Sequence, residues 1–454
     1  MGDSTSWQDG LSRAREANQV DSWLAAEGID VVHLGIYDNS GTLREKRLPA
    51  RAAAEAIECG WSFIDAIQYW DPSDATFVDS GATSEAAAVD LDSGRRYPFE
   101  PSAAAFVADF TGASAALSPR RQLIKLVERA ATLGLHARVG WEFECIVLDQ
   151  DARSLSTSEQ LVPTEPANRC WSALTPAVEA EMLTALSATL AAGDVPLHHT
   201  CSELGPGCLE LAFRAGPIVR AADDAACAKL YTKAFFARRG QTATFMAQLA
   251  DGFPGLGGHP SLSLWDDDGR PALSETDGEL AKLGRSAIAG IVRLMPELLV
   301  MAASTVNAYR RYAPGNWAPR SATWGPGNYT CGVRHVVGRP EDARLELRIP
   351  GADTSTHLCS AMLLGAVVWG IEQAWDPPDP ILPPANGRDV VDREIGALPR
   401  TLLEGAERFA DSETARELFG PVFVDHFAAS RVAEDEACRR FVSAQERTRY
   451  LHQV

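Results

Sequence analysis

The apolar stretch from Val139 to Leu148 constrains the fold of this chain most, because two carboxylates are set inside it. Glu142 and Glu144 stand two positions apart, and side chains alternate across a strand, so both acids point to the same face. Two such carboxylates repel each other and lose hydration, which favours protonation unless a cation lies between them. Taken alone, the stretch is better explained by an edge strand whose acidic face meets water.

The same kind of acid pattern recurs at other places in the chain. Glu203 and Glu210 flank a turn of glycine and proline, which can fold the chain back and bring the two acids together. Glu346 lies between two arginines in an alternating strand, and His259 follows a glycine-rich approach. Five glutamates and one imidazole could hold two hard divalent cations, and oxygen ligands favour Mg²⁺ or Mn²⁺ over zinc.

Composition excludes several classes of protein. The chain of 454 residues is long enough for a large core and for two domains. It has neither an apolar run that would span a membrane nor a start typical of a secretion signal, so we expect a cytoplasmic protein. The net charge of −19 disfavours nucleic acid and anionic membranes as partners. Nine irregularly spaced cysteines indicate reduced thiols rather than a zinc site, and we expect Cys201 and Cys208 to be packing residues.

The first part of the chain has the pattern of a small sheet. Residues 31–37 are predicted as a strand, and a turn of Asp, Asn, Ser and Gly then returns residues 42–48 as its hairpin partner. The acid-rich stretch 71–98, with its prolines and glycines, is predicted to be mostly loop with short strands. Ser118 and Pro119 carry the signature of a helix start, so we place the boundary between two domains at 117/118.

The second part is predicted to be rich in helices. Periodicity and composition indicate helices over 122–133, 175–192, 221–240, 277–304, 358–375 and most of 401–450. The fourth of these is expected to continue through Gly290. The fifth is apolar almost all round, which indicates a buried helix. The last segment is polar and is typical of a covering layer or a subunit contact.

The acids, the histidine and several neighbouring motifs occur in the order found in the glutamine synthetase family, which this chain resembles over most of its length. The motifs are Gly140-x-Glu142-x-Glu144, Glu203-x-Gly-Pro-Gly-x-x-Glu210, Gly257-x-His259 with Ser263, Asn307-x-Tyr-Arg-Arg311, Pro314-Gly315, Trp324-Gly325 and Arg344-x-Glu346-x-Arg348. The resemblance implies an α+β fold, with a β-grasp domain over 1–117 and a catalytic domain over 118–454 built on a curved antiparallel sheet and helices. It also implies an ATP-dependent ligase that phosphorylates the side-chain carboxylate of glutamate and lets an amine displace the phosphate.

The resemblance further implies which residues hold two cations, Mg²⁺ or Mn²⁺. In the family pattern one cation is held by the residues matching Glu144, Glu203 and Glu210, and the other by those matching Glu142, His259 and Glu346. Fixed cations suit phosphoryl transfer, because the negative charge of the moving group is spread over several oxygens.

Other positions match residues that bind substrates in the family. Arg311 matches the arginine that grips the glutamate α-carboxylate, and a planar guanidinium suits bidentate binding of that group. The residues matching the phosphate and nucleotide contacts are Ser263, Arg334, Arg344 and Arg348. Gly255, like Gly257, is expected to let the backbone approach the substrate closely. For Arg310 we prefer a surface ion pair.

Several positions depart from the family pattern, among them Ser355-Thr-His357, which replaces the usual Asn-Pro-Tyr. Trp317 stands where ammonia-using members carry the glutamate that takes a proton from ammonium, and a tryptophan offers an organic amine an apolar or cation-binding wall instead. With a tryptophan at this position, the chain resembles the branch of the family that makes γ-glutamyl amides. Tyr329 replaces a phosphate-contacting arginine, and Ser261 stands where a second histidine is frequent.

Three functions remain open on these residues. The favoured one is a glutamate–amine ligase. The second is an ammonia-using glutamine synthetase in which another carboxylate, such as Asp65 of a neighbouring subunit, serves as base. The third is a catalytically silent structural or regulatory relative. In each case the resemblance implies a homo-oligomer, commonly a dodecamer of two hexameric rings in which one subunit's small domain completes the next subunit's active site.

Overall fold

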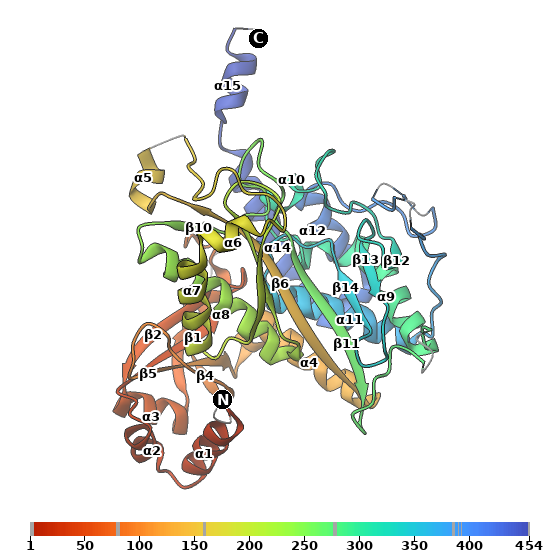
Figure 1. Ribbon diagram of the computed structural model, residues 1–454. Coiled ribbons are helices and arrows are strands. Elements are labelled where there is room, and N and C mark those ends of the chain that lie inside the picture. Colours follow the sequence, from red (N-terminus) through yellow and green to blue (C-terminus); the bar gives the residue numbers. More distant parts are fainter. Residues whose placement is uncertain are drawn as a thin grey trace.

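The computed structural model describes residues 4–78, 82–157, 160–275, 279–383, 386–388, 390–391 and 393–452. Within these residues the chain forms one sheet of five strands and one of nine, each with its own cluster of buried apolar side chains. The small sheet and helices α1 to α3 lie at one end of the molecule, and the large sheet and its helices make up the body (Figure 1).

The small sheet has the strand order β2-β1-β5-β4-β3. Strands β1 and β5 run parallel and the other pairs are antiparallel. Its elements are α1 (Ser4–Glu16), α2 (Val20–Ala26), β1 (Val31–Tyr37), β2 (Leu43–Pro49), α3 (Ala50–Cys59), β3 (Trp61–Ile64), the 3₁₀ helix η1 (Asp65–Tyr69), β4 (Ser84–Arg96), β5 (Ala103–Phe110) and the 3₁₀ helix η2 (Ala113–Leu117). The predicted boundary at 117/118 falls between η2 and the next helix.

The predicted hairpin is confirmed, and its turn is stabilised locally. The carboxylate of Asp38 accepts hydrogen bonds from the backbone N–H groups of Ser40 and Thr42, at 2.9 and 2.8 Å. Gly41 has a φ of +83°, a conformation that residues with a Cβ rarely adopt. These contacts return the chain directly into β2.

The prediction that residues 71–98 contain only short strands is wrong, although the described residues of 71–83 lie outside the named helices and strands, as expected. The long strand β4 occupies 84–96, with Ala87 and Val89 buried on one face and Ala86 and Ala88 exposed on the other. A register irregularity between Asp90 and Arg95 bends it along β5. The strand is therefore specified by its pairing with β5, and two of its acidic residues have partners: Glu85 accepts hydrogen bonds from Ser114, and Asp90 forms an ion pair with Arg120.

The large sheet has the strand order β12-β13-β14-β11-β6-β8-β7, with β6 near its middle. Two short strands, β9 and β10, also pair with β6. The strands are β6 (Leu135–Leu148), β7 (Leu197–Ser202), β8 (Cys208–Phe213), β9 (Gly216–Pro217), β10 (Thr242–Thr244), β11 (Gly258–Asp266), β12 (Trp324–Pro326), β13 (Val333–Val336) and β14 (Arg344–Leu347). The candidate strand around Glu142 is thus an interior strand and not an edge strand.

Helices cover one face of this sheet, and α4 and α8 pack directly on β6. The helices of the body are α4 (Pro119–Thr132), α5 (Ala152–Thr157), α6 (Leu174–Val178), α7 (Ala180–Ala192), α8 (Ile218–Ala237), α9 (Lys282–Leu298), η3 (Leu299–Met301), α10 (Val306–Arg310), α11 (Thr356–Glu372), α12 (Leu402–Asp411), α13 (Glu413–Phe419), α14 (Pro421–Arg439) and α15 (Ala444–Tyr450). The helix predicted over 175–192 is broken into α6 and α7 at Glu179. Asp277, where another helix was expected to start, lies outside the described residues.

Two helices behind the sheet approach each other closely at a pair of glycines. A Cβ on Gly290 of α9 would lie 2.0 Å from the carbonyl oxygen of Ala366 in α11, and one on Gly370 would lie 2.3 Å from that of Ser286. The glycines therefore let α9 and α11 pack backbone against backbone. Helix α11 is buried almost all round, as its apolar composition predicts.

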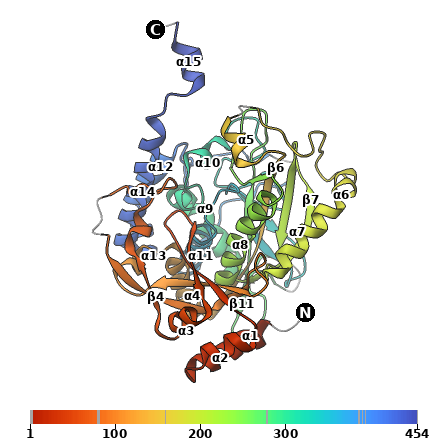
Figure 2. The same cartoon turned by 90° about the vertical axis from the view of Figure 1, so that its left-hand side faces the viewer.

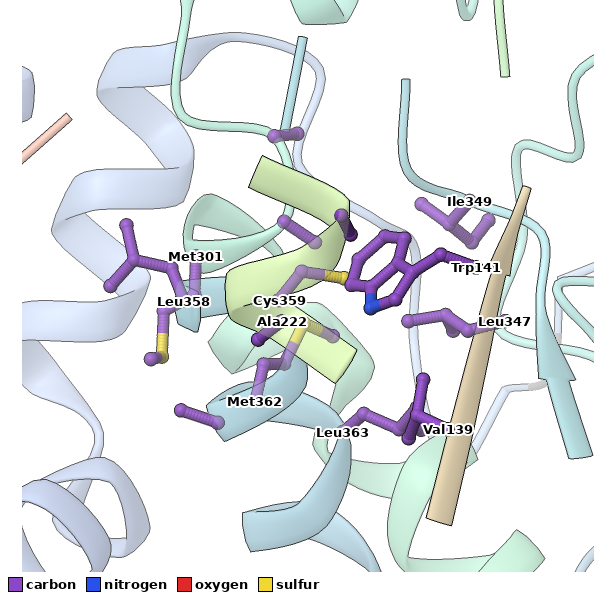
Figure 3. Close-up of a cluster of buried hydrophobic side chains, with 14 of the residues drawn as sticks. Val139, Trp141, Ala222, Met301, Leu347, Ile349, Leu358, Cys359, Met362 and Leu363 are labelled. Atoms are coloured by element: carbon purple, nitrogen blue, oxygen red, sulfur yellow. The ribbon is translucent and has the colours of Figure 1, made fainter. Parts of the chain in front are cut away.

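The inward face of β6 is aromatic. Trp141 and Phe143 are buried, and their ring centroids lie 5.1 Å apart in a stacked arrangement. Trp141 packs among Val139 and side chains of β14, α8 and α11, including Leu347 and Met362 (Figure 3). Because neighbours alternate across the strand, burying Trp141 and Phe143 turns Glu142 and Glu144 to the opposite face.

A buried charge cluster joins the small sheet to the body. Arg120 of α4 forms ion pairs with Asp90 of β4, Asp109 of β5 and Asp223 of α8, at 2.5, 2.6 and 2.8 Å. His357, at the start of α11, also contacts Asp223 at 2.8 Å. Although burial opposes the charge on Asp223, Arg120 and His357 hold its pKa below the usual range.

Candidate active site

Strand register places the predicted metal-binding acids opposite one another. Glu142 of β6 lies opposite His259 of β11, and Glu144 lies opposite Glu210 of β8. Glu346 of β14 lies opposite Ser261, two positions along β11 from His259 and on the same face. Four strands that are distant in sequence therefore contribute to one patch on the face of the sheet turned away from the helices.

Glu142, His259 and Glu346 form a compact group, with one ligand atom from each lying within 4.8 Å of the others. Nδ1 of His259 is 2.8 Å from a carboxylate oxygen of Glu142 and 3.9 Å from one of Glu346. Burial, followed by the nearby Arg348 and Arg311, lowers the pKa of His259 well below its usual value. The imidazole is therefore neutral and can offer a lone pair to a cation.

Glu144, Glu203 and Glu210 are more widely arranged. In the described part of the chain, these three side chains do not bring one ligand atom each within 4.8 Å of one another. Burial raises the pKa of Glu144 to about 7 and that of Glu210 to about 8, and neighbouring glutamates add to both effects. A divalent cation would stabilise the ionised form of these carboxylates, so the three side chains fit a hard metal ion.

The turn that carries Glu203 is fixed by glycines and by an asparagine. Gly205 and Gly207 have φ values of +107° and +65°. The side-chain amide of Asn168 donates to the carbonyl oxygens of Glu203, Gly205 and Cys208, at 2.8, 2.8 and 3.1 Å. These hydrogen bonds therefore hold the turn rigid next to the Glu203 side chain.

The carboxylate of Glu203 accepts hydrogen bonds from side chains that the sequence did not suggest. Trp171 donates its indole N–H at 2.8 Å, and the thiol of Cys170 donates at 3.3 Å. Both residues lie in a loop without a periodic pattern, so spacing gave no signal for them. The indole of Trp171 is 70% exposed, so this contact lies at the surface of the site.

Arginines surround the buried carboxylate of Glu346. Arg334 and Arg348 both donate to it, and both guanidinium groups lie against the ring of Tyr329, 4.0 and 5.2 Å from its centroid. Arg348 also donates to the Tyr329 carbonyl oxygen at 3.0 Å. Tyr329 removes a positive charge relative to the family pattern, but it packs against the two arginines that remain.

Arg311 is buried next to the histidine. Its guanidinium donates to the carbonyl oxygen of Ile349 at 2.8 Å and to Nε2 of His259 at 3.2 Å, while its Nε has no hydrogen-bond partner among the described residues. A Cβ on Gly255 would lie 2.7 Å from Cγ of Arg311, and one on Gly257 would lie 2.4 Å from the His259 ring. These glycines therefore make room for the side chains of Arg311 and His259. The close approach of a substrate to the backbone stays a second, predicted role.

The predicted nucleotide contacts lie further along the same strands. Ser263 shares a face of β11 with His259 and accepts a hydrogen bond from the Trp265 indole at 3.0 Å. Arg344 shares a face of β14 with Glu346 and donates to the carbonyl oxygen of Asp342 at 3.0 Å. Arg310, for which a surface ion pair was preferred, is exposed and forms no ion pair among the described residues.

Trp317 lies in the loop that follows Arg311, and its indole is 57% exposed. The neighbouring Asn316 donates to the Arg311 carbonyl oxygen and to the Gln248 side chain, both at 3.0 Å, which ties this loop to the site. The guanidinium of Arg388 lies 4.4 Å from the centroid of the Trp317 ring. Arg388 is far away in sequence and was missed by the sequence analysis.

The carboxylate patch is partly exposed, with 29% of the Glu142 side chain and 15% of the Glu210 side chain accessible to solvent. A cavity of about 650 Å³ lies elsewhere, between α10, α12 and α14, and is lined by Tyr309, Arg310 and Asp435 among others. None of the described helices has the length and apolar character needed to cross a bilayer.

Comparison with known proteins gives a consistent result. Residues 116–450 match the model of the glutamine synthetase catalytic domain. The chain is 32% identical to a glutamate–isopropylamine ligase of Pseudomonas sp. over 450 residues, covering 95% of this chain and 97% of the relative. It is 32% identical to the γ-glutamylethanolamide synthetase GlnA4 of Streptomyces coelicolor over 418 residues, covering 89% and 88%. The solved complex of GmaS with ADP is 25% identical and superposes with a TM-score of 0.81, over 95% of this chain and 99% of that one.

Proposed function

Because the chain belongs to the glutamine synthetase family, we propose that it is an ATP-dependent ligase that joins the γ-carboxylate of glutamate to an organic amine. Ligases of this family use ATP and divalent cations. The carboxylate first takes the terminal phosphoryl group of ATP, which forms γ-glutamyl phosphate and ADP. A neutral amine then attacks the acyl carbon, phosphate leaves, and the amine loses a proton.

The observation that carries the proposal is the compact group of Glu142, His259 and Glu346 with two arginines at its edge. Divalent cations, which we propose to be Mg²⁺ or Mn²⁺, would offset the charge of the transferred phosphoryl group. Glu142, His259 and Glu346 would hold one cation. Glu144, Glu203 and Glu210 would hold the other, through small movements of the carboxylates.

The remaining side chains would bind and orient the substrates. Arg334 and Arg348 can turn their free N–H groups to phosphoryl oxygens while Glu346 and Tyr329 fix their planes. Arg311 presents a guanidinium beside His259 for the glutamate α-carboxylate, with Gly255 beneath it. Ser263 and Arg344 extend the same faces of β11 and β14 towards the nucleotide.

An organic amine is proposed as the nucleophile because of Trp317. An indole cannot take a proton from ammonium, but its exposed face can cover carbon atoms of an amine. At about 25 cal/mol per Å², a contact of ~60 Å² contributes about 1.5 kcal/mol, which is roughly tenfold in selectivity over ammonia. The names of the two relatives, a glutamate–isopropylamine ligase and a γ-glutamylethanolamide synthetase, support a small amine with one nitrogen as the substrate.

The test is phosphate release from ATP with glutamate, measured with ammonia and with a panel of amines. The proposal predicts the highest kcat/KM for a small organic amine, and a mass-spectrometric product that contains glutamate and that amine. Glu142→Gln is expected to lower kcat by at least about 100-fold through loss of a metal ligand. Glu128→Gln, an exposed change on α4, is the matched control.

The alternatives give different results in the same assay. An ammonia-using synthetase would show its highest kcat/KM with ammonia. A catalytically silent relative would release no phosphate with any nucleophile at saturating Mn²⁺. Either outcome would overturn the ligase proposal.

We also propose that the chain assembles into closed rings, as a dodecamer of two hexamers. The partly exposed carboxylate patch supports this, because a second subunit could cover it. Helix α15 extends away from the body beyond α14 (Figure 2), and Phe441, Val442 and Leu451 next to it are 80%, 66% and 68% exposed. Light scattering is expected to show a particle of about twelve subunits; an active monomer would contradict this.

A further inference from the structure

A second group of potential metal ligands lies beside the carboxylate patch and differs from it in chemistry. Nε2 of His199, the thiol of Cys201 and a carboxylate oxygen of Glu210 all lie within 4.8 Å of one another. The thiol and the imidazole nitrogen are each 3.6 Å from the same oxygen of Glu210. One nitrogen, one sulfur and one oxygen ligand therefore converge.

These separations match the edges of a tetrahedral zinc site. With bonds of about 2.3 Å to sulfur and about 2.1 Å to nitrogen and oxygen, tetrahedral angles separate sulfur from oxygen by about 3.6 Å and nitrogen from oxygen by about 3.4 Å. The observed distances are 3.6 Å for both pairs. Two of the three edges thus fit tetrahedral coordination of zinc, and the nitrogen and the sulfur lie within 4.8 Å of each other.

Strand pairing explains why the three side chains meet. His199 and Cys201 are two positions apart in β7 and share a face, and Cys201 lies directly opposite Glu210 of β8. Nδ1 of His199 is 2.8 Å from Nδ1 of His198. A contact of this kind at the second ring nitrogen orients metal-binding histidines and leaves Nε2 free to face the metal.

We propose that His199, Cys201 and Glu210 form a site for a divalent cation that prefers thiolate and imidazole ligands, such as Zn²⁺. On binding, the Cys201 thiol would release its proton to solvent and the thiolate would ligate the cation. The fourth position would be open, and the imidazole of His199 is half exposed, which gives the cation access. Mg²⁺ and Mn²⁺ would not compete well here, because they favour oxygen ligands.

The site has a consequence for activity that rests on the proposed function. Glu210 is also a proposed ligand of the Mg²⁺ or Mn²⁺ in the active site. Because Zn²⁺ would take the Glu210 oxygen that faces Cys201 and place a second positive charge beside the active-site cation, it would weaken binding of that cation and inhibit the ligase. Cys201 would then act as a positioning residue that makes the enzyme sensitive to zinc.

The binding claim is tested without substrates. The full chain is titrated with Co²⁺, whose thiolate complexes absorb strongly in the near ultraviolet, and Zn²⁺ affinity is measured by competition with a chromophoric chelator. We expect a thiolate band at one equivalent in the wild-type protein, and its loss in Cys201→Ser. Cys201→Ser and His199→Asn should each weaken Zn²⁺ binding by more than about 100-fold, since second-shell losses alone cost 10- to 100-fold.

Cys438→Ser is the matched control, because Cys438 is also a thiol near a carboxylate, 3.8 Å from Glu434, but lies on α14. A Co²⁺ band that survives in Cys201→Ser, or that disappears in Cys438→Ser, overturns the site. Circular dichroism of each variant separates lost ligands from lost folding. If the band behaves as expected but amines are not ligated, the proposed function fails and the metal site stands.

Discussion

Replacing Arg388 by glutamine tests how the amine is chosen. A diamine attacks with a neutral nitrogen but keeps a positive charge on its far end. That ammonium would be attracted by the face of the Trp317 indole, which is worth about 0.5–1 kcal/mol at an exposed site. Arg388 already lies on this ring and would repel the same charge. The wild-type enzyme is therefore expected to prefer monoamines.

The size of the effect follows from the geometry. The guanidinium lies 4.4 Å from the ring centroid, and a bound ammonium would lie within about 6 Å on the other face. Two unit charges about 10 Å apart repel by about 0.4 kcal/mol in water and by about 1.7 kcal/mol at an effective dielectric constant of 20. Screening at physiological ionic strength favours the lower value. Arg388→Gln should thus raise diamine selectivity by about 2- to 5-fold.

The assay compares kcat/KM for a four-carbon diamine with kcat/KM for isopropylamine in each protein. Because both values come from one preparation, a lower fraction of folded enzyme cancels in the ratio. Arg51→Gln is the control, since it removes the same charge from a side chain that is 91% exposed on the small domain. An unchanged ratio in Arg388→Gln, or an equal change in Arg51→Gln, would refute the reasoning.

Three further predictions concern stability. Arg120→Leu leaves buried carboxylates unpaired and should lower the free energy of unfolding by about 3–5 kcal/mol in urea titrations, against less than about 0.5 kcal/mol for Arg51→Leu. Gly290→Ala forces a Cβ to 2.0 Å from a carbonyl oxygen of α11 and should cost at least about 1–3 kcal/mol, whereas Gly216→Ala, with no atom within 4 Å of its new Cβ, should be near neutral. Burial raises the pKa of Glu144 to about 7, so the stability that its bound proton gives the metal-free protein is complete below the unfolded pKa and is lost as pH rises through 7. Because Mn²⁺ competes with that proton, it should raise Tm more at pH 8 than at pH 6. Equal shifts of Tm at the two pH values would count against the metal assignment.

The sequence predicted elements whose signals are local and missed those that depend on distant pairing. The β1–β2 hairpin follows from the Asp38 turn, and α11 from its continuous apolar composition. The length of strand β4 was missed because alanines lie on both of its faces and give no alternating pattern, so only pairing with β5 reveals it. The break at Glu179 between α6 and α7 follows Pro176 by three residues, a local signal that the helix prediction over 175–192 did not use.

The site divides in the same way. Alternation alone placed Glu142 and Glu144 on one face, but the register between β6 and β11 decides that His259 meets Glu142. Side chains in irregular loops, such as Trp171 and Arg388, could not be placed, because no period links them to the strands they contact. The residue-by-residue assignment of ligands remains a prediction for the variants above to test.

The long central strand β6 also limits where insertions and deletions can occur in this chain. Pairing on both sides and an aromatic inner face mean that a slip of one residue would bring Glu142 and Glu144 into the core and expose Trp141 and Phe143. A single-residue insertion or deletion between 139 and 148 would therefore remove the core and the acid patch together. Length variation among homologues is expected to be absent from this strand and to begin only after it ends.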